Sequence, residues 1–203
     1  MIQLNHVGEH LISAIINRSA DIKLVMQSVF GISPEHLLAV PEIRLDRCEH
    51  LIFDGAHKID ISLLDMRNNT CVPIEAKLGL DRLSKSEFEK RFLKGCHTSH
   101  NETRIAGSMI SVLERLLPPE CNDKQLSVIY EGQRFTLSNQ WGLISREKIF
   151  NRWNQGSFPK LSANCRHLKF EELVRRFGSK DNFNSLITEL LDVDFYSQWI
   201  IPE

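Results

Sequence analysis

The N-terminal part of the chain shows the hydrophobic spacing of short amphipathic helices. Apolar side chains recur every three or four residues and predict a first helix that ends near residues 17–19, with Val7, Leu11, Ile12, Ile15 and Ile16 on one face. A second helix is predicted over residues 22–30, because Gly31 follows as a natural C-terminal stop. Residues 33–40 begin with serine and proline, which suit a helix start, so one or two helical turns are expected there.

From residue 43 the spacing becomes extended, and turn dipeptides separate the runs. Asp54-Gly55 and Asn68-Asn69 accept the positive φ that tight hairpin turns require. They divide three runs that are expected to be strands, over residues 43–53, 57–66 and 70–78. The sequence therefore predicts an antiparallel meander.

Helical and extended patterns alternate in the rest of the chain. Periodicity predicts helices over residues 84–93 and 103–117. Two apolar runs predict further strands over residues 126–130 and 141–145. From Arg146 onward the pattern is helical.

The composition is that of an ordinary globular chain. The 203 residues are 42% hydrophobic and 25% charged, which is enough for one domain with a full core or for a domain with a small appendage. From the order of helical and extended patterns we expect an α/β core over residues 1–145 and a helical C-terminal extension over residues 146–203 packed on it. No apolar run approaches the roughly 20 residues of a membrane span, and the N-terminus lacks the pattern of a signal peptide. Five scattered cysteines without a CxxC pair favour reduced thiols, so a cytoplasmic location without membrane contact is expected.

The turn at Asn68-Asn69 specifies which residues of its hairpin lie opposite each other. A two-residue turn places Asp60 opposite Lys77 and Ser62 opposite Glu75. Because side chains alternate along a strand and paired residues share a face, one face is wholly apolar, with Ile59, Ile61, Leu63, Val72, Ile74, Ala76 and Leu78. The other face collects Lys58, Asp60, Ser62, Leu64, Cys71, Pro73, Glu75 and Lys77. All the charged groups of this motif therefore fall together.

Asp60, Glu75 and Lys77 form a set with the chemistry of a metal-dependent phosphodiesterase. Two carboxylates on neighbouring strands repel each other, and a hard divalent cation such as Mg²⁺ relieves that repulsion through oxygen ligands. The ion supplies a nucleophilic water and polarises phosphoryl oxygens. Lys77 could orient that water or stabilise the negative charge that grows on the phosphate. The alternative is a solvated ion pair of Asp60 and Lys77, worth about 0 to 1 kcal/mol.

Asp60 on one strand, a hairpin, and the run Ile74-Glu75-Ala76-Lys77 on the next strand resemble the PD-(D/E)xK nuclease superfamily. The resemblance implies that Asp60 and Glu75 bind the metal together with the carbonyl oxygen of Ala76. It also implies that Lys77 serves the attacking water. The implied reaction is Mg²⁺-dependent hydrolysis of nucleic-acid phosphodiesters, and Mn²⁺ is expected to substitute for Mg²⁺.

The resemblance further implies a fold and an additional acid. It covers roughly residues 7–145, with Ile59 where the motif has proline, and implies a restriction-endonuclease-like αβββαβ core whose mixed central sheet is flanked by helices. Glu9, on the preceding helix, corresponds to the extra catalytic acid of some members. Glu49 is the rival for that role, because pairing about Asp54-Gly55 sets it opposite Asp60.

The net charge of -1 indicates no particular partner, but the charges are unevenly distributed. Residues 146–180 hold nine Lys or Arg and three Glu, whereas residues 181–203 hold five acids and no base. A solvated helix face explains many such charges without any function. The candidates for contact with nucleic acid are Lys85, Arg104, Arg175 and Arg176.

The predicted function is that of a Mg²⁺-dependent deoxyribonuclease, expected to be an endonuclease in restriction, phage defence or repair. DNA is the expected partner, and a homodimer or larger complex is left open. The alternative is a nuclease-like fold that acts as a non-catalytic nucleic-acid-binding or assembly module. The complete set of Asp60, Glu75 and Lys77 favours the enzyme, because an abandoned site is free to lose members. The choices of DNA over RNA and of internal over terminal cleavage stay open.

Overall fold

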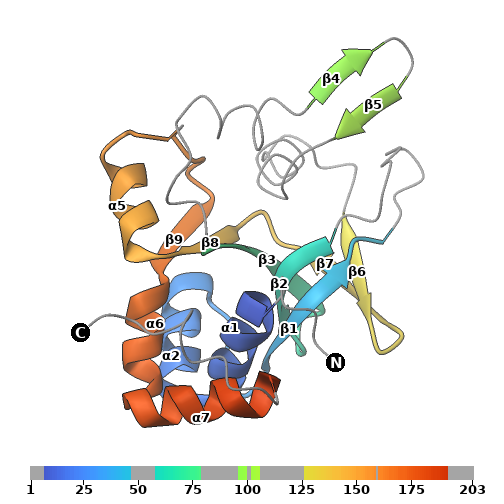
Figure 1. The fold of residues 1–203 in the computed structure, drawn as a ribbon. Helices are drawn as coiled ribbons and strands as arrows, with labels where there is room; N and C mark the ends of the chain where they lie inside the picture. Colours follow the sequence, from blue (N-terminus) through green and yellow to red (C-terminus); the bar gives the residue numbers. More distant parts are fainter. Residues whose placement is uncertain are drawn as a thin grey trace.

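Four helices cover one face of a mixed β-sheet in the part of the chain that the structure describes (Figure 1). The structure is a computed structural model that describes residues 7–46, 58–78, 126–158 and 160–191, and the backbone of residues 96–99 and 102–105. It confirms an α/β fold in which helices flank a mixed sheet. No helix in these ranges is long and apolar enough to cross a membrane.

The strands form a large sheet and a separate small one. The large sheet has the order β1, β2, β3, β7, β6, while β8 pairs with β3 and β9 pairs with β8. Its strands are β1 (Leu37–Arg44), β2 (Lys58–Asp65), β3 (Thr70–Lys77), β6 (Ser127–Tyr130), β7 (Gln133–Leu137), β8 (Trp141–Ser145) and β9 (Cys165–Lys169). The small sheet pairs β4 (Cys96–Ser99) with β5 (Glu102–Ile105).

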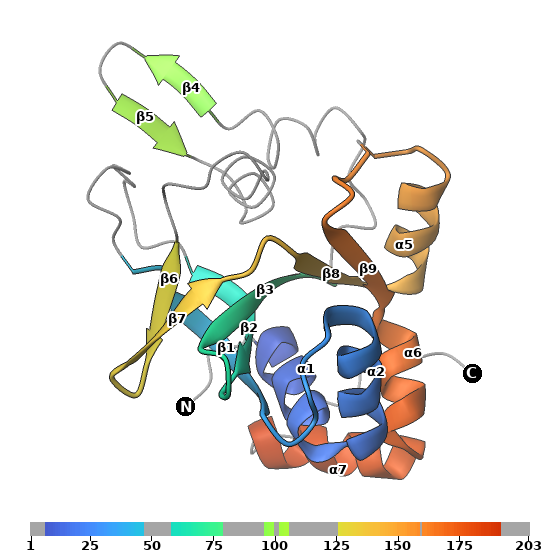
Figure 2. The same cartoon turned by 180° about the vertical axis from the view of Figure 1, so that it is seen from behind.

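Strand β3 is the centre of the large sheet, because three strands pair with it. On one side it is antiparallel to β2. On the other side its first two residues pair in parallel with β7, and its last four pair in parallel with β8. Strands β8 and β9 are also parallel, so β3, β8 and β9 end at one edge of the sheet, with Lys77, Ser145 and Lys169 in register. The β6–β7 hairpin and the β8–β9 pair lie at opposite ends of the sheet (Figure 2).

The two N-terminal helices confirm their predictions. Helix α1 (Val7–Arg18) ends where the spacing indicates. Helix α2 (Ala20–Phe30) begins two residues before the predicted start, because the Ser19 hydroxyl accepts a hydrogen bond from the Ile22 N–H as an N-cap. Gly31 ends α2 with a φ of 76°, a left-handed conformation that glycine adopts without strain. The described residues also form helices α5 (Glu147–Asn154), α6 (Phe170–Phe177) and α7 (Lys180–Leu191).

The helical turns predicted over residues 33–40 are wrong, because this segment enters strand β1. Leu37 and Ala39 are buried in the core beneath α1. Pro41 is tolerated because β1 is the outermost strand beside β2, where a missing N–H costs no ladder hydrogen bond. The side-chain amide of Asn17 both donates to the Ala39 carbonyl and accepts from the Ala39 N–H, each at 2.8 Å. This pair of bonds ties α1 to the open side of β1.

The register of the β2–β3 hairpin differs from the prediction by two residues. Asp65, not Arg67, pairs with Thr70. The longer loop forms because the Asp65 carboxylate accepts hydrogen bonds from the N–H groups of Arg67 and Asn68 and from the Asn68 side chain. A shift of two residues keeps paired side chains on their predicted faces, whereas a shift of one reverses them.

Two further expectations are wrong in the described residues, and one strand there was not predicted. Strand β7 follows a turn in which Glu131 and Gly132 both have positive φ, and no strand is predicted there. Strand β9 lies in the region predicted to be helical and joins the sheet beside β8. Arg104, predicted to lie on a helix, belongs to β5 opposite His97. The helix predicted over residues 84–93 lies outside the described residues, as do Lys85 and Glu49.

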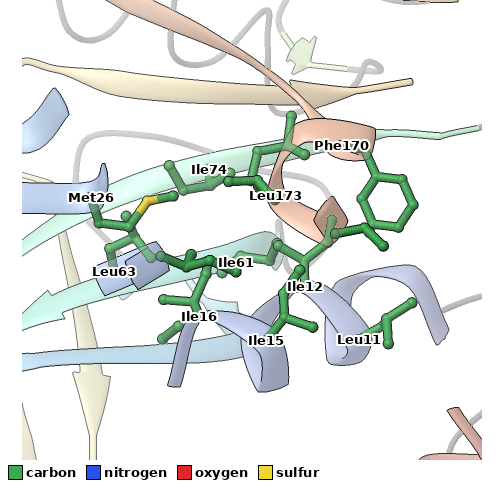
Figure 3. Packing of buried hydrophobic residues seen from close by; sticks show 14 of the residues in the cluster. Leu11, Ile12, Ile15, Ile16, Met26, Ile61, Leu63, Ile74, Phe170 and Leu173 are labelled. Atoms are coloured by element: carbon green, nitrogen blue, oxygen red, sulfur yellow. The ribbon is translucent and has the colours of Figure 1, made fainter. Parts of the chain in front are cut away.

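The first hydrophobic core fills the space between the sheet and helices α1, α2, α6 and α7. Figure 3 shows Ile12 and Ile16 of α1 packed toward Ile61 of β2, with Ile74 of β3 and Leu173 of α6 close by. The predicted apolar face of the hairpin supplies this core, except for Ile59, which belongs to the second core.

The second core covers the opposite face of the sheet. Helix α5 contributes Ile149 and Trp153, and the β6–β7 hairpin contributes Phe135. Leu64 and Cys71, from the face that carries the charged residues, are fully buried in it. Both faces of β3 are therefore covered along most of its length, so the Glu75 side chain on this strand is withdrawn from water.

The close packing of β3 against β8 is tested at Gly142. A Cβ at this position would overlap the Cδ1 atom of Ile74 and lie 2.9 Å from the Cζ atom of Phe30. We expect Gly142→Ala to lower the free energy of unfolding by about 1 to 3 kcal/mol, as measured by urea denaturation. Ile74→Val removes the overlapping methyl group, so the double variant should lose less than the sum of the single losses. Additive losses would contradict this account of the packing.

Candidate active site

Asp60 and Glu75 lie across from each other at the point where the β2–β3 pairing ends. The last backbone pair joins Ile61 to Ile74, and the same register continued by one residue sets Asp60 opposite Glu75. Beyond this pair the Asp60 side chain provides the acceptor that a backbone carbonyl would otherwise provide. Its Oδ2 atom accepts a hydrogen bond of 2.8 Å from the Ala76 N–H. The bond directs the Asp60 carboxylate toward β3 and Glu75.

Lys77 completes the group. Its Nζ atom forms an ion pair with Oε1 of Glu75 and lies 3.8 Å from Oδ2 of Asp60. The side chains of Glu75, Lys77 and Asp60 are 1%, 13% and 23% exposed. The three predicted residues therefore share one face, as the sequence indicates. Since Glu75 is withdrawn from water, the alternative of a fully solvated strand face is wrong.

Burial controls the protonation of this group. It raises the pKa of Glu75 to about 7, with contributions from the negative charges of Asp60 and Glu9, although the ammonium group of Lys77 acts in the opposite direction. Burial alone would lower the pKa of Lys77, but the charges of Glu75, Asp60 and Glu9 outweigh it and leave that pKa above its ordinary value. Lys77 is thus charged near neutral pH, while Glu75 is close to its midpoint.

One oxygen of Glu75 is left with unused bonding capacity. Its Oε2 atom is buried and has no hydrogen-bond partner among the described residues. Such an atom is costly in a folded protein unless a water, an ion or a ligand satisfies it. The donor set around it consists of hard oxygens, namely the Asp60 and Glu75 carboxylates and the Ala76 carbonyl, which is the type of ligand that Mg²⁺ and Mn²⁺ prefer.

The number of protein ligands is small. No group of three or more His, Cys, Asp or Glu side chains within the described ranges is arranged to hold a metal ion. A cation bound by Asp60 and Glu75 would therefore complete its coordination with the Ala76 carbonyl, water or substrate oxygens. This suits Mg²⁺, which retains several waters and seldom occupies an all-protein cage.

Two further acids lie near the triad. Glu9, in the first turn of α1, makes the smallest of the contributions to the pKa shifts of Glu75 and Lys77, so its negative charge acts on both groups. The β1–β2 pairs of Pro41 with Ile61 and of Ile43 with Ile59 leave Glu42 at the position that faces Asp60, so the register predicted from the Asp54-Gly55 turn is wrong for the described residues. Glu49 itself lies outside them. Glu42 forms an ion pair with Lys58, in which Oε1 of Glu42 lies 3.0 Å from Nζ of Lys58.

Glu42 is not among the residues that the sequence places near Asp60, although the residues before it indicate a strand. The apolar run before Pro41 fits a buried strand at least as well as a helix. In the structure Glu42 has a φ of 57° inside strand β1, and its Oε2 atom lies 3.6 Å from Nε2 of His10. A positive φ at a residue other than glycine stores strain, and such residues cluster at functional sites.

Two of the predicted nucleic-acid contacts, Arg175 and Arg176, are not brought to the group of Asp60, Glu75 and Lys77. Arg175 and Arg176 occupy the last turn of α6, whereas its first residue, Phe170, adjoins the strand edge that ends in Lys77. Arg176 is paired with Glu172 on the same helix. The side chain of Arg104 and all of Lys85 lie outside the described residues.

Comparison of the chain with protein-family models, curated proteins and solved structures finds no match. The function therefore has to be argued from the geometry of the described residues.

The raised pKa of Glu75 makes a prediction about stability without metal. Its stabilising effect is complete below the unfolded pKa of about 4.5 and is lost as the pH rises through the folded pKa of about 7. We expect the stability of the wild type relative to Glu75→Gln to fall by up to about 3 kcal/mol between pH 4.5 and 8, in urea denaturation with EDTA.

The matched control for this experiment is Glu172→Gln, which alters a half-exposed ion pair on α6. It should leave the pH dependence of stability parallel to that of the wild type. Equal pH dependence in the wild type and Glu75→Gln would contradict the buried, protonatable carboxyl.

Proposed function

We propose that this protein is a Mg²⁺-dependent nuclease that hydrolyses DNA phosphodiester bonds, with endonucleolytic cleavage expected. The observation that carries the proposal is the buried Glu75 carboxylate, which pairs with Lys77 through one oxygen and leaves the other without a partner among the described residues. In a purely structural ion pair, the unpaired Oε2 atom of Glu75 adds nothing to stability. A cation site uses it.

Each residue of the site has a proposed role that follows from its chemistry. Asp60 and Glu75 would hold the cation, with the Ala76 carbonyl beside them, and the Ala76 N–H fixes the orientation of the Asp60 carboxylate. When bound, the cation lowers the pKa of a water and polarises the scissile phosphate. Lys77 supplies a positive charge that can orient the attacking water and stabilise the negative charge on the phosphate. Glu9 adds negative charge to the cation site.

The topology supports the same proposal. Helix α1 precedes the antiparallel strands β1, β2 and β3, and β8 later joins β3 in parallel. The first helix, the three antiparallel strands and the later parallel strand correspond to parts of the αβββαβ core implied by the resemblance to the PD-(D/E)xK superfamily, while the described residues include no helix between β3 and β8. The paired carboxylates also lie toward the edge at which the parallel strands end, a position where open α/β sheets bind ligands.

The metal requirement gives the first test of this function. Millimolar Mg²⁺ or Mn²⁺ should raise the thermal midpoint of the wild type. The corresponding gain in the free energy of unfolding is up to about a few kcal/mol when the ion is in large excess over its dissociation constant. Asp60→Asn keeps an oxygen that can accept from Ala76 but removes the charge, so it should abolish the shift. Glu172→Gln should retain it. Equal shifts in the wild type and Asp60→Asn would exclude Asp60 as a ligand.

The role of Lys77 gives the second test. Lys77→Met removes the charge and preserves the apolar stem, so cleavage of plasmid DNA should fall by roughly 10²-fold or more. Stabilisation by Mg²⁺ should persist and increase, because the two carboxylates then lack an internal cation. The control is Lys58→Met, which removes a lysine paired with Glu42 instead.

The substrate is identified by comparing plasmid, linear duplex, single-stranded DNA and RNA, each with Mg²⁺, Mn²⁺ or EDTA. Cleavage at the wild-type rate by Lys77→Met would remove the catalytic role of this lysine. Metal-dependent stabilisation without cleavage of any substrate would favour the non-catalytic binding or assembly module instead.

A further inference from the structure

Lys169 lies on the same face and at the same strand edge as Lys77. The β3–β8 register pairs Lys77 with Ser145, and the β8–β9 register pairs Ser145 with Lys169. Residues that pair across neighbouring strands share a face of the sheet. Since neighbouring strands are about 4.8 Å apart, the backbones of the two lysines are about 10 Å apart. Both side chains lie on the face that carries Asp60 and Glu75.

Helix α5 lies beside β9 and holds the Lys169 ammonium group in place (Figure 1). The Nζ atom lies 3.0 Å from Oε1 of Glu147, in the first turn of α5, and 5.0 Å from the centroid of the Phe150 ring. The face of an aromatic ring attracts a cation. Phe150 in turn packs against the imidazole of His167, with the ring centroids 4.4 Å apart. The positive charge is thus held at the strand edge without any ligand.

The ion pair with Glu147 leaves Lys169 able to bind another anion. The side chains of Lys169 and Glu147 are 31% and 53% exposed, and solvent-exposed pairs contribute little to stability. An ammonium group has three donors. It can therefore bind a phosphate oxygen beside Glu147 or in its place. Because Glu147 carries the same sign of charge as a phosphate, it competes with such a ligand.

The separation of the two lysines suits a nucleic-acid strand. Each strand of duplex DNA carries one phosphate per about 3.4 Å of helix axis. The span of about 10 Å between β3 and β9 is therefore longer than the step between neighbouring phosphates. When the scissile phosphate lies beside Asp60, Glu75 and Lys77, a phosphate further along the same strand comes within reach of the Lys169 side chain.

We propose that Lys169 binds a backbone phosphate close to the scissile phosphate on the same substrate strand. This inference rests on the proposed function. Lys77 and Lys169 then hold two phosphates of one strand, which crosses the sheet edge where β3, β8 and β9 end. Because a phosphate contact carries no base information, Lys169 orients the substrate and adds affinity for every sequence alike.

The salt dependence of DNA binding tests this contact in the absence of cleavage. Lys169→Met removes the charge and preserves the apolar stem. For a short duplex in EDTA, the slope of log affinity against log salt concentration should become shallower by about 0.9, because fewer counterions are released. The weakening should be equal for unrelated sequences.

The control for the salt experiment is Arg18→Met. It removes an exposed arginine that pairs with Glu189, at the opposite end of α1 from Glu9. Its salt slope should match that of the wild type.

Glu147 supplies a variant with the opposite effect. Glu147→Gln removes the competing carboxylate and should tighten binding of the same duplex by roughly twofold to fivefold. In the Lys169→Met background the gain should be smaller, because the carboxylate and the phosphate then have no shared partner. A gain of the same size in both backgrounds would overturn the competition for Lys169.

Cleavage kinetics separate this contact from the proposed nuclease. With Mg²⁺, Lys169→Met should raise KM for plasmid DNA roughly fivefold and leave kcat unchanged, because the contact is the same before and during the reaction. Binding that depends on Lys169 without cleavage of any substrate would overturn the proposed nuclease but not the contact. An unchanged salt slope in Lys169→Met would overturn the contact, whether or not the wild type cleaves DNA. Absence of DNA binding by the wild type would overturn both.

Discussion

The buried ion pair between Glu75 and Lys77 is the constraint on which the rest of the site depends. Removing two charges from water is costly, and their attraction compensates only when the remaining bonding capacity is also satisfied. Lys77 forms an ion pair with one carboxylate oxygen of Glu75, while the other oxygen has no hydrogen-bond partner in the described part of the chain. Asp60 adds a second negative charge to the same group. Burying these charges costs folding free energy, but the same arrangement suits the binding of a cation. The site is therefore better explained by function than by a contribution to stability.

The position of β3 makes this arrangement possible. An antiparallel strand flanks it on one side and parallel strands on the other, and a hydrophobic core covers each face. Such a strand is normally apolar throughout, because both of its faces are buried. Its two charged residues occupy its end, at the edge where β3, β8 and β9 stop together. The cores thus exclude water from one side of the group, while the strand edge leaves Asp60 and Lys77 partly accessible.

Much of this site was accessible from the sequence because the period of a strand is two. An error of two residues in the predicted turn changed the partner of Asp60 from Lys77 to Glu75, but it left the three side chains on one face. In α1 and α2, where the prediction depended on helical spacing and on a glycine stop, it agreed with the structure, whereas residues 103–105, also predicted as helix from spacing, belong to strand β5. Short segments were the weak point. Strand β1 was read as helical turns and β9 as helix, since a few residues cannot distinguish the two periods and pairing with neighbours decides between them.

The sequence by itself determined the α/β class, the antiparallel hairpin of β2 and β3 and the grouping of Asp60, Glu75 and Lys77, because these follow from local periodicity and turn chemistry. Only the tertiary structure decided that Glu75 is withdrawn from water, since the second core comes from α5, β7 and β8, far along the chain. It also decided that Glu42 lies opposite Asp60 and that Ser145 lies beside Lys77. These neighbours depend on which strands pair and in which register. No local pattern encodes that choice, because it is made by the burial of both faces of the sheet at once.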